Sequence, residues 1–453
     1  MRKRWKTGDW IVVSKLLLRI LLSQRALLLS LLAPLSFLSV ETFATEYTVS
    51  DVETLAAALR QYRANDVLLL KKGVYHVRFS INKPDVTLRG EKGTIIDAAN
   101  DGIAIKVRKP GVRIQNLEIR NYGRDLKARH AGVRVYQGAH DVRLDNLKLS
   151  GPGFGIRADR VNGLHIENCE IAGDEALSEI DRGDGVFLKH VNNPVLRNNR
   201  ISNVRDGFYL EYVKGSRVTE NTFDGTVYAV HFMYTSGDEA SHNTATRARG
   251  AWALMDSENI KLHHCRADVN KVFGILLNVA NGCEVHDNIV TRTSNPEGNA
   301  ASNTDGKAIF IYGPGKNSIH DNIFSDSDIG ISMAMGGEGN LIWRNAFLNN
   351  RVQVRYVGEK PLEWSHEGIG NYWSTHLGWD IDKDGIGDRP YQPNDSLDRI
   401  FWIYPEALFL MDSPVVALMR WISNQFELDR GKGVTDSHPL MSFPASPAFA
   451  NLP

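Results

Sequence analysis

A repeat of about 22 residues is the feature of this sequence that most restricts its fold. Eight segments align without gaps and share one column, which reads Cys169, Asn199, Asn221, Asn243, Cys265, Asn288, Asn322 and Asn345. Successive members of the column are 30, 22, 22, 22, 23, 34 and 23 residues apart. A period of this length with occasional insertions is typical of a solenoid, in which each coil stacks on its neighbours.

Each coil carries a second short apolar segment after the column: GVFL, GFYL, AVHF, AWAL, GILL, AIFI and GISM. Short apolar strands without helical periodicity predict an all-β chain folded as a parallel β-helix. The asparagine column predicts an internal ladder whose side-chain amides bond the backbone of the coils above and below. Cys169 and Cys265 fall in this column, and the only other cysteine is Cys283, so we expect buried thiols and no disulfide framework.

The chain divides into five segments. Residues 1–44 read as a secretory signal peptide, with basic MRKRWK, an apolar run over 26–40 and a cleavage position after Ala44. A membrane anchor is the alternative, which Pro34 and the short apolar run disfavour. We expect an N-terminal cap over 45–66 with a helix at 52–63, the β-helix over 67–360, a Gly- and aromatic-rich cap over 361–403, and C-terminal helices and a tail over 404–453. The protein should therefore be exported and should mature near Thr45.

The charge balance argues against a nucleic-acid-binding protein. Lys and Arg together number 53, as do Asp and Glu, so the formal net charge is zero. A neutral balance gives no indication of a strongly basic surface for a polyanion.

The second strand of each coil predicts an outward face with unusual side chains. Because successive residues of a strand alternate between faces, every second position should point away from the coil. These outward pairs are Tyr209/Glu211, His231/Met233, Ala253/Met255, Leu276/Asn278, Phe310/Tyr312 and Ser332/Ala334.

His231, Met233 and Met255 are the main candidate metal ligands. Neighbouring coils lie about 4.8 Å apart, which places Met233 over Met255 with His231 on the same strand. Two thioethers and an imidazole suit a soft ion, above all Cu(I) bound transiently. The alternative is an apolar patch for a protein partner, built from its neighbours Tyr209, Leu276, Phe310 and Tyr312.

Two further groups could bind cations. His263, His286 and His320 recur two residues before the ladder column, and a stack of imidazoles could bind copper or zinc; ordinary surface histidines are the alternative. Asp380, Asp382, Asp384 and Asp388 resemble the start of a Ca²⁺ loop, which could also take Mg²⁺. Tyr391 replaces the expected glutamate, so an acidic glycine turn remains the alternative.

Many parallel β-helices act on polysaccharides, and such chemistry needs clustered carboxylates, or a carboxylate with Arg or Lys, in one groove. The predicted outward columns carry Tyr, His, Met, Leu and Phe instead of stacked acids. We therefore expect no enzymatic activity. A secreted glycan epimerase or lyase and a metal-free structural adaptor remain the alternatives.

The C-terminal block carries a specific family resemblance. GNYWSTHLGWDIDKDGIGDRPYQPND (370–395), SPVVALMRW (413–421) and DSHPLM (436–441) resemble the NosD family, and the resemblance spans essentially the whole exported chain. It implies a right-handed parallel β-helix in the periplasm that works with the ABC transporter subunits NosF and NosY and reaches the membrane only through these partners. It also implies receipt of copper from the chaperone NosL and help in assembling the metal centres of nitrous oxide reductase. Apolar side chains of the C-terminal helices could dock on the membrane subunit, and packing within the protein is the alternative for them: Leu408, Phe409, Leu410, Val416, Leu418, Met419 and Trp421.

Overall fold

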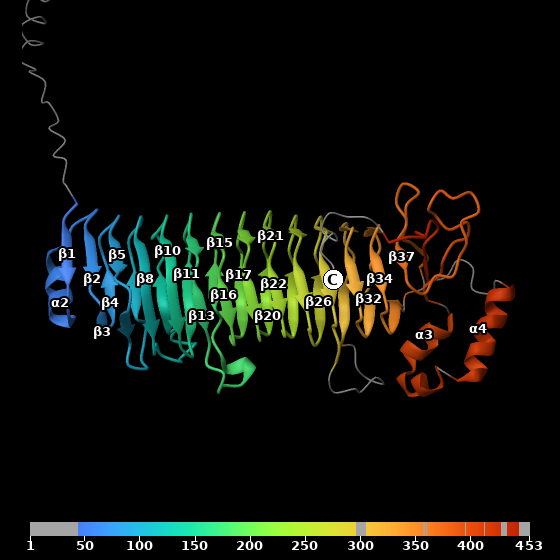
Figure 1. The fold of residues 1–453 in the computed structure, drawn as a ribbon, viewed down its shortest axis with the longest axis horizontal. Coiled ribbons are helices and arrows are strands. Elements are labelled where there is room, and N and C mark those ends of the chain that lie inside the picture. The colour runs from blue at the N-terminus through green and yellow to red at the C-terminus, as the bar shows by residue number, and fades with distance from the viewer. Residues whose placement is uncertain are drawn as a thin grey trace, which may run out of the picture. The chain divides into compact units, whose positions relative to one another are not determined.

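The computed structural model describes residues 44–295, 305–356, 358, 360–394, 396–411, 413–426 and 433–443. The predicted signal peptide lies outside these residues except for Ala44, so its prediction stands untested. Thr45–Pro453 forms one compact unit, in which β-strands pair in parallel from coil to coil (Figure 1). The predicted parallel β-helix is therefore confirmed. Within the described part of the chain, no helix is long and apolar enough to cross a membrane.

The coils contribute to three parallel ladders. Two belong to a 24-stranded sheet. The first of them joins β1 (Glu46–Val49), β2 (Val67–Leu70), β5 (Thr87–Gly90), β8 (Arg113–Arg120), β10 (Arg143–Ser150), β12 (His165–Glu167), β15 (Val195–Arg197), β18 (Arg217–Thr219), β21 (Glu239–Ser241), β24 (Lys261–His263), β27 (Glu284–His286), β30 (Ser318–His320) and β33 (Leu341–Trp343). The second shares β8 and β10 and adds β3 (Gly73–His76), β6 (Thr94–Asp97), β13 (Glu170–Ala172), β16 (Arg200–Ser202), β19 (Thr222–Asp224), β22 (Thr244–Thr246), β25 (Arg266–Asp268), β28 (Ile289–Thr291), β31 (Ile323–Ser325), β34 (Ala346–Leu348) and β37 (Tyr372–Trp373).

The third ladder is a separate 12-stranded sheet. It joins β4 (Phe79–Ile81), β7 (Ile105–Val107), β9 (Ala131–Val135), β11 (Phe154–Asp159), β14 (Val186–Lys189), β17 (Asp206–Glu211), β20 (Tyr228–Met233), β23 (Gly250–Met255), β26 (Phe273–Asn278), β29 (Lys307–Tyr312), β32 (Ile329–Ala334) and β35 (Val352–Tyr356). The residues predicted to point into the coil are fully buried, among them Phe208, Leu210, Phe232 and Trp252. Their alternation along the strand is what fixes which side chains face outward.

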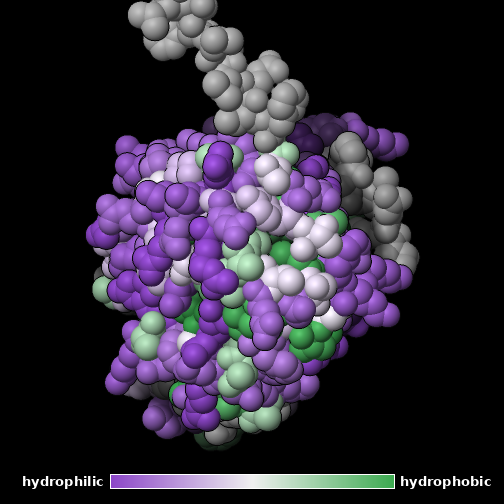
Figure 2. Space-filling model, turned by 90° about the vertical axis from the view of Figure 1, so that its left-hand side faces the viewer, coloured by the Kyte–Doolittle hydropathy of each residue, from purple (hydrophilic) through white to green (hydrophobic). Residues whose placement is uncertain are grey.

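Helix α2 (Val52–Gln61) covers the first coil. Its N-terminus is a capping box, because the Asp51 carboxylate accepts from the backbone N–H of Thr54 while the Thr54 hydroxyl accepts from that of Asp51. Leu55 and Ala58 are buried on its inner side. Figure 2 views the molecule from this end, where the surface is mostly hydrophilic. The helix thus covers a strand edge that would otherwise be open to another chain.

The asparagine column forms the predicted ladder inside the coil. The Asn221 carbonyl oxygen Oδ1 accepts from the backbone N–H of Asn199 at 2.9 Å, and Nδ2 donates to the carbonyl oxygen of Leu196 at 2.9 Å. Nδ2 also donates to Oδ1 of Asn243 at 2.9 Å. Each amide therefore bonds the backbone of the preceding coil and the side chain of the following one, rather than backbone on both sides. Each bond contributes about 1 kcal/mol, and a buried amide left without partners costs more.

The three cysteines are buried and free, as expected. Burial raises the pKa of Cys169 and Cys265 to about 12 and that of Cys283 to about 11. These thiols stay protonated near neutral pH and are poor metal ligands, since the thiolate is the binding form.

The C-terminal segments end the coil stack. They comprise β36 (Leu362–Glu363), α3 (Ser396–Ile403), the 3-10 helix η2 (Pro405–Leu410), α4 (Pro414–Phe426) and β38 (Val434–Thr435), and β38 pairs with β36. The fully buried Asp436 carboxylate accepts from the backbone N–H of Asn371 at 2.7 Å, where the asparagine ladder ends. Trp373 Nε1 donates to the same oxygen at 2.8 Å. The tail therefore closes the polar ladder.

Candidate metal centres

The strand register of the 12-stranded sheet agrees with the prediction from the repeat. Met233 pairs with Met255 on the adjacent strand, and His231 lies between Tyr209 and Ala253 in its own column. We refer to His231, Met233 and Met255 as the methionine face. β20 and β23 position these side chains because the last four residues of each strand alternate between the two faces, which turns them away from the core residues Val230, Phe232, Trp252 and Leu254.

The outward face is only partly solvated, and His231 is buried although the alternation turns it away from the coil. The His231 side chain is buried, with 8% of the residue exposed. Outward side chains from neighbouring strands pack into a second apolar cluster outside the coil. It contains Ala253, Phe273 and Leu276, with the partly buried Tyr228, Met255, Val272 and Phe310 against them. Leu276 is therefore poorly placed for the proposed partner patch, whereas Tyr312 is exposed.

The imidazole of His231 is held by three neighbours. Nδ1 lies 3.2 Å from Oδ2 of Asp206, and the ring packs edge to face with Tyr209 and Tyr228 at centroid distances of 4.8 and 4.9 Å. Nε2 is buried and has no hydrogen-bond partner among the described residues. With the Asp206 carboxylate accepting from Nδ1–H, the neutral ring keeps its lone pair on Nε2, the arrangement found in metal-ligating histidines.

The sequence analysis missed an ion-pair group with two buried carboxylates, which lies at the start of the strands β14 and β17. Arg205 Nη2 lies 2.9 Å from Oδ1 of Asp184 and 3.7 Å from Oδ2 of Asp206. Burial and the neighbouring Asp206 charge raise the pKa of Asp184 to about 7. The two aspartates are 22 residues apart, one repeat period, so the spacing could have revealed the pair. The group fixes the carboxylate that contacts His231.

The second predicted set, His263, His286 and His320, forms a stack. Ring centroids are 4.9 Å apart from His263 to His286 and 5.2 Å from His286 to His320, with interplanar angles of 6° and 4°. Parallel stacked rings direct their nitrogen lone pairs side by side. The geometry therefore does not support one ion shared by all three.

The structure instead brings His286 together with two residues that the sequence analysis did not single out. His264, His286 and Asp287 each offer one ligand atom, and these atoms lie within 4.8 Å of one another. We refer to these three residues as the histidine corner. His264 and Asp287 occupy the left-handed corner position of adjacent coils, with φ of 53° at each. The signal was available, since both directly precede a member of the ladder column.

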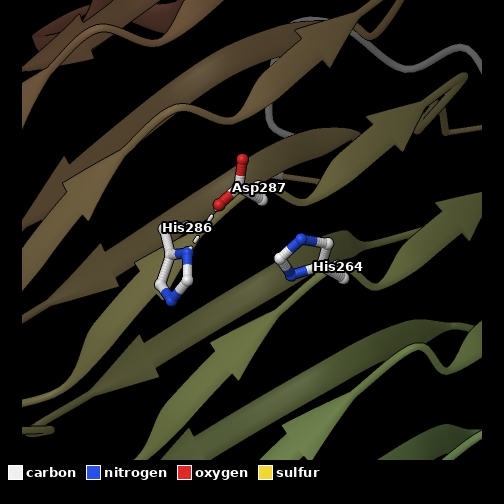
Figure 3. Close-up of side chains that lie close together, drawn as sticks. All are labelled: His264, His286 and Asp287. Atoms are coloured by element: carbon white, nitrogen blue, oxygen red, sulfur yellow. Dashed lines mark hydrogen bonds and ion pairs between the residues drawn. The ribbon is translucent and has the colours of Figure 1, made fainter. Parts of the chain in front are cut away.

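The histidine corner is accessible. Figure 3 shows His286 bonded to Asp287, with the His264 ring facing that pair from the adjacent coil. A surface cavity of about 230 Å³ lies beside them, lined by His242, Thr244, His264, Cys265, Arg266, Asp287 and Ile289. Burial lowers the pKa of His263 and His264, which favours neutral rings with available lone pairs.

In the predicted cation loop, carboxylates accept hydrogen bonds from the backbone of the loop itself. Ligand atoms of Asp380, Asp382 and Asp384 lie within 4.8 Å of one another. Asp380 accepts from the backbone N–H groups of Asp384 and Gly385, and Asp388 accepts from that of Ile381 at 2.8 Å. These bonds form an acidic turn, and Ca²⁺ or Mg²⁺ binding stays a prediction.

Comparison with known proteins identifies close relatives. The family described as "Periplasmic copper-binding protein (NosD)" matches residues 166–378. "Probable ABC transporter binding protein NosD" of Pseudomonas aeruginosa is 38% identical over 379 residues, which cover 83% of this chain and 88% of the relative. The protein of the same name from Stutzerimonas stutzeri is 35% identical over 83% of this chain and 86% of its own length.

Among solved structures, the alginate lyase AlyF-OU02 in complex with G6 matches with a TM-score of 0.51 at 13% identity. The match covers 73% of this chain and 84% of the lyase. At this identity the likeness concerns the fold alone.

Proposed function

The chain belongs to the NosD family, described as periplasmic copper-binding proteins, and we propose that it carries copper as cargo on the methionine face. The observation that carries the proposal is the buried, unpartnered Nε2 of His231 on the sheet face that also carries the two in-register methionines. A buried nitrogen lone pair without a donor is costly unless something occupies it. Copper would satisfy it.

The donor set favours Cu(I) over harder ions. Methionine sulfur and neutral imidazole are soft to borderline ligands, which a univalent copper ion prefers. Met233 and Met255 are only partly buried, and their unbranched stems can rotate to bring both sulfurs toward His231. The apolar surroundings would exclude water from the ion. Two or three neutral ligands would hold it exchangeably and leave room for a ligand from a partner.

In this role the chain would take copper from NosL and pass it on during assembly of nitrous oxide reductase. Family membership supports this route, since the relatives are named as ABC transporter binding proteins. Tyr209 pairs with His231 on the neighbouring strand, whereas Phe310 and Tyr312 lie two strands beyond β23 in the same sheet. These side chains, all at least partly exposed, would contact a copper-donating or copper-accepting partner.

Cu(I) titration against a chromogenic chelator tests the proposed site. Met233→Leu/Met255→Leu removes both sulfurs at nearly constant volume, and His231→Gln removes the imidazole. Each should weaken Cu(I) binding at least about tenfold. Met335→Leu is the matched control, because Met335 is 71% exposed and lies off this face.

Unchanged Cu(I) affinity in both site variants would refute copper binding at the methionine face. Turnover of alginate or pectin by the purified chain would instead favour the glycan-active alternative. Complex formation without any copper binding would favour the metal-free adaptor.

The C-terminal helices are the proposed docking surface for the NosF/NosY transporter. Phe409 and Trp421 are 81% and 60% exposed, and Leu410, Leu418 and Met419 are also exposed. Val416 is buried and belongs to the packing of α4, while the Leu408 side chain lies outside the described part. Such a concentration of exposed apolar side chains is typical of a binding surface.

Co-purification with NosF/NosY tests this docking. Phe409→Ser/Trp421→Ser should reduce the bound fraction severalfold and leave Cu(I) affinity unchanged. Ile180→Ser is the control, because Ile180 is an equally exposed apolar residue in the 3-10 helix η1 (Glu179–Asp181). Equal loss in both variants would contradict a specific C-terminal interface.

A further inference from the structure

We propose that the histidine corner binds a second metal ion, a borderline divalent ion of the Zn²⁺ or Cu²⁺ type, independently of the methionine face. The two sites lie on different sheets: the methionine face on β20 and β23, and the histidine corner at the ends of β24 and β27. They also differ in donor chemistry. Two imidazoles and a carboxylate suit a borderline divalent ion, whereas two thioethers and an imidazole suit Cu(I).

The hydrogen bonds around the corner leave nitrogen lone pairs available. His263 Nε2 lies 3.2 Å from Oε1 of Glu239, so that carboxylate accepts from Nε2–H and His263 Nδ1 carries a lone pair. His264 Nδ1 lies 2.9 Å from this nitrogen and must donate to it. The chain of bonds therefore leaves the lone pair of His264 on Nε2. This is the same carboxylate–histidine ordering that orients metal ligands in known sites.

His286 and Asp287 complete the donor set. His286 Nδ1 lies 2.7 Å from Oδ2 of Asp287, so one proton is shared between two groups that both ligate metals well. An ion entering from the adjacent cavity would displace the proton between His286 and Asp287 to solvent, or would bind next to this pair. Water would then occupy the fourth ligand position of the ion. His242 lines the same cavity and stacks on His264 at 5.0 Å, which steadies the ring that the ion would contact.

The next coil offers an internal comparison. His320 Nδ1 lies 2.8 Å from Oδ2 of Asp321, which repeats the His286–Asp287 bond. The following corner residue is Arg344, whose Nε lies 3.0 Å from Oδ1 of Asp321. A guanidinium cannot ligate a cation, and its charge opposes one. The same histidine–aspartate pair thus exists with and without a neighbouring corner imidazole.

Equilibrium dialysis of the exported chain with Zn²⁺, and separately with Cu²⁺, tests the proposal. His264→Asn and Asp287→Asn keep residues that accept the left-handed corner, and each should weaken the corner site at least about tenfold. Asp321→Asn is the matched control and should leave affinity within about twofold. With Cu²⁺, electron paramagnetic resonance should show nitrogen coupling that weakens in His264→Asn.

Zn²⁺ and Cu²⁺ affinities unchanged in both His264→Asn and Asp287→Asn would overturn the site, and so would equal weakening in Asp321→Asn. Cu(I) affinity at the methionine face should stay unchanged in all three variants. The corner site and the proposed copper cargo site can therefore fail separately.

Discussion

The methionine face and the histidine corner are built from neighbouring coils, yet His231 is buried in the first and His264 is exposed in the second. β20, β23 and β26 are six residues long, and their outward side chains lie close enough on one flat surface to cover each other. β24 and β27 are three residues long and end at a left-handed corner, where side chains diverge and His264 is exposed. An outward position in the register therefore does not determine exposure. The width of the flat surface around it does.

The largest expected effect is a difference in unfolding free energy between variants that each remove one aromatic ring, one on the surface of the methionine face and one on the surface of the histidine corner. Phe273→Ala removes a buried ring from the cluster outside the coil and should cost about 3 kcal/mol of unfolding free energy, as in a protein interior. Trp343→Ala removes a partly buried ring that stacks on His320 at 4.4 Å and should cost about 1 kcal/mol. Urea denaturation followed by circular dichroism measures both. Equal losses would show that the outer cluster is ordinary surface.

The next effect tests whether the histidine corner depends on the ladder beneath it. The Asn288 amide accepts from the backbone N–H of Cys265 at 3.0 Å and donates to the carbonyl oxygen of Leu262 at 2.8 Å. Asn288→Ala leaves these groups buried without partners, and should cost about 2 kcal/mol. The same variant should lose Zn²⁺ binding and keep Cu(I) binding. Asn281→Ala, at an exposed position, should change stability by less than about 0.5 kcal/mol.

The strand register was predictable from the sequence because residues about 22 positions apart occupy equivalent places in successive coils and therefore pair with each other. His231, Met233 and Met255 lie in the columns that the alternation predicts. Burial was not predictable in the same way, because it depends on side chains from several neighbouring strands.

Contacts outside the columns also escaped the sequence analysis. Asp436 bonds Asn371 across 65 residues, and no periodicity links these positions. The strand columns do not single out His264 and Asp287, because both residues lie at a left-handed corner between two strands rather than within a strand.

A pH titration tests the buried carboxylates beside the methionine face. The pKa of Asp184 is raised to about 7 from an ordinary value near 3.8, so the folded chain binds more protons than the unfolded chain between these values. The unfolding free energy should therefore fall as the pH rises from about 4 through 7. Asp184→Asn should reduce this fall in unfolding free energy between pH 4 and 7 by an amount on the order of 1 kcal/mol. Urea midpoints measured from pH 4 to 8 would decide, and an unchanged slope would contradict the raised pKa.

The smallest expected effect concerns Cys265, which lines the cavity at the histidine corner without belonging to the donor set. Its sulfur lies 3.3 Å from the carbonyl oxygen of His263, pointing into the ladder, and burial raises the pKa of the thiol to about 12. Cys265→Ser preserves a donor of similar size, so Zn²⁺ and Cu(I) affinities should both stay within about twofold. The folded chain should also resist thiol alkylation until it is denatured. A large loss of Zn²⁺ affinity in Cys265→Ser would mean that the ion draws a thiolate out of the ladder, and the corner would then be a mixed sulfur and nitrogen site rather than one of imidazole and carboxylate.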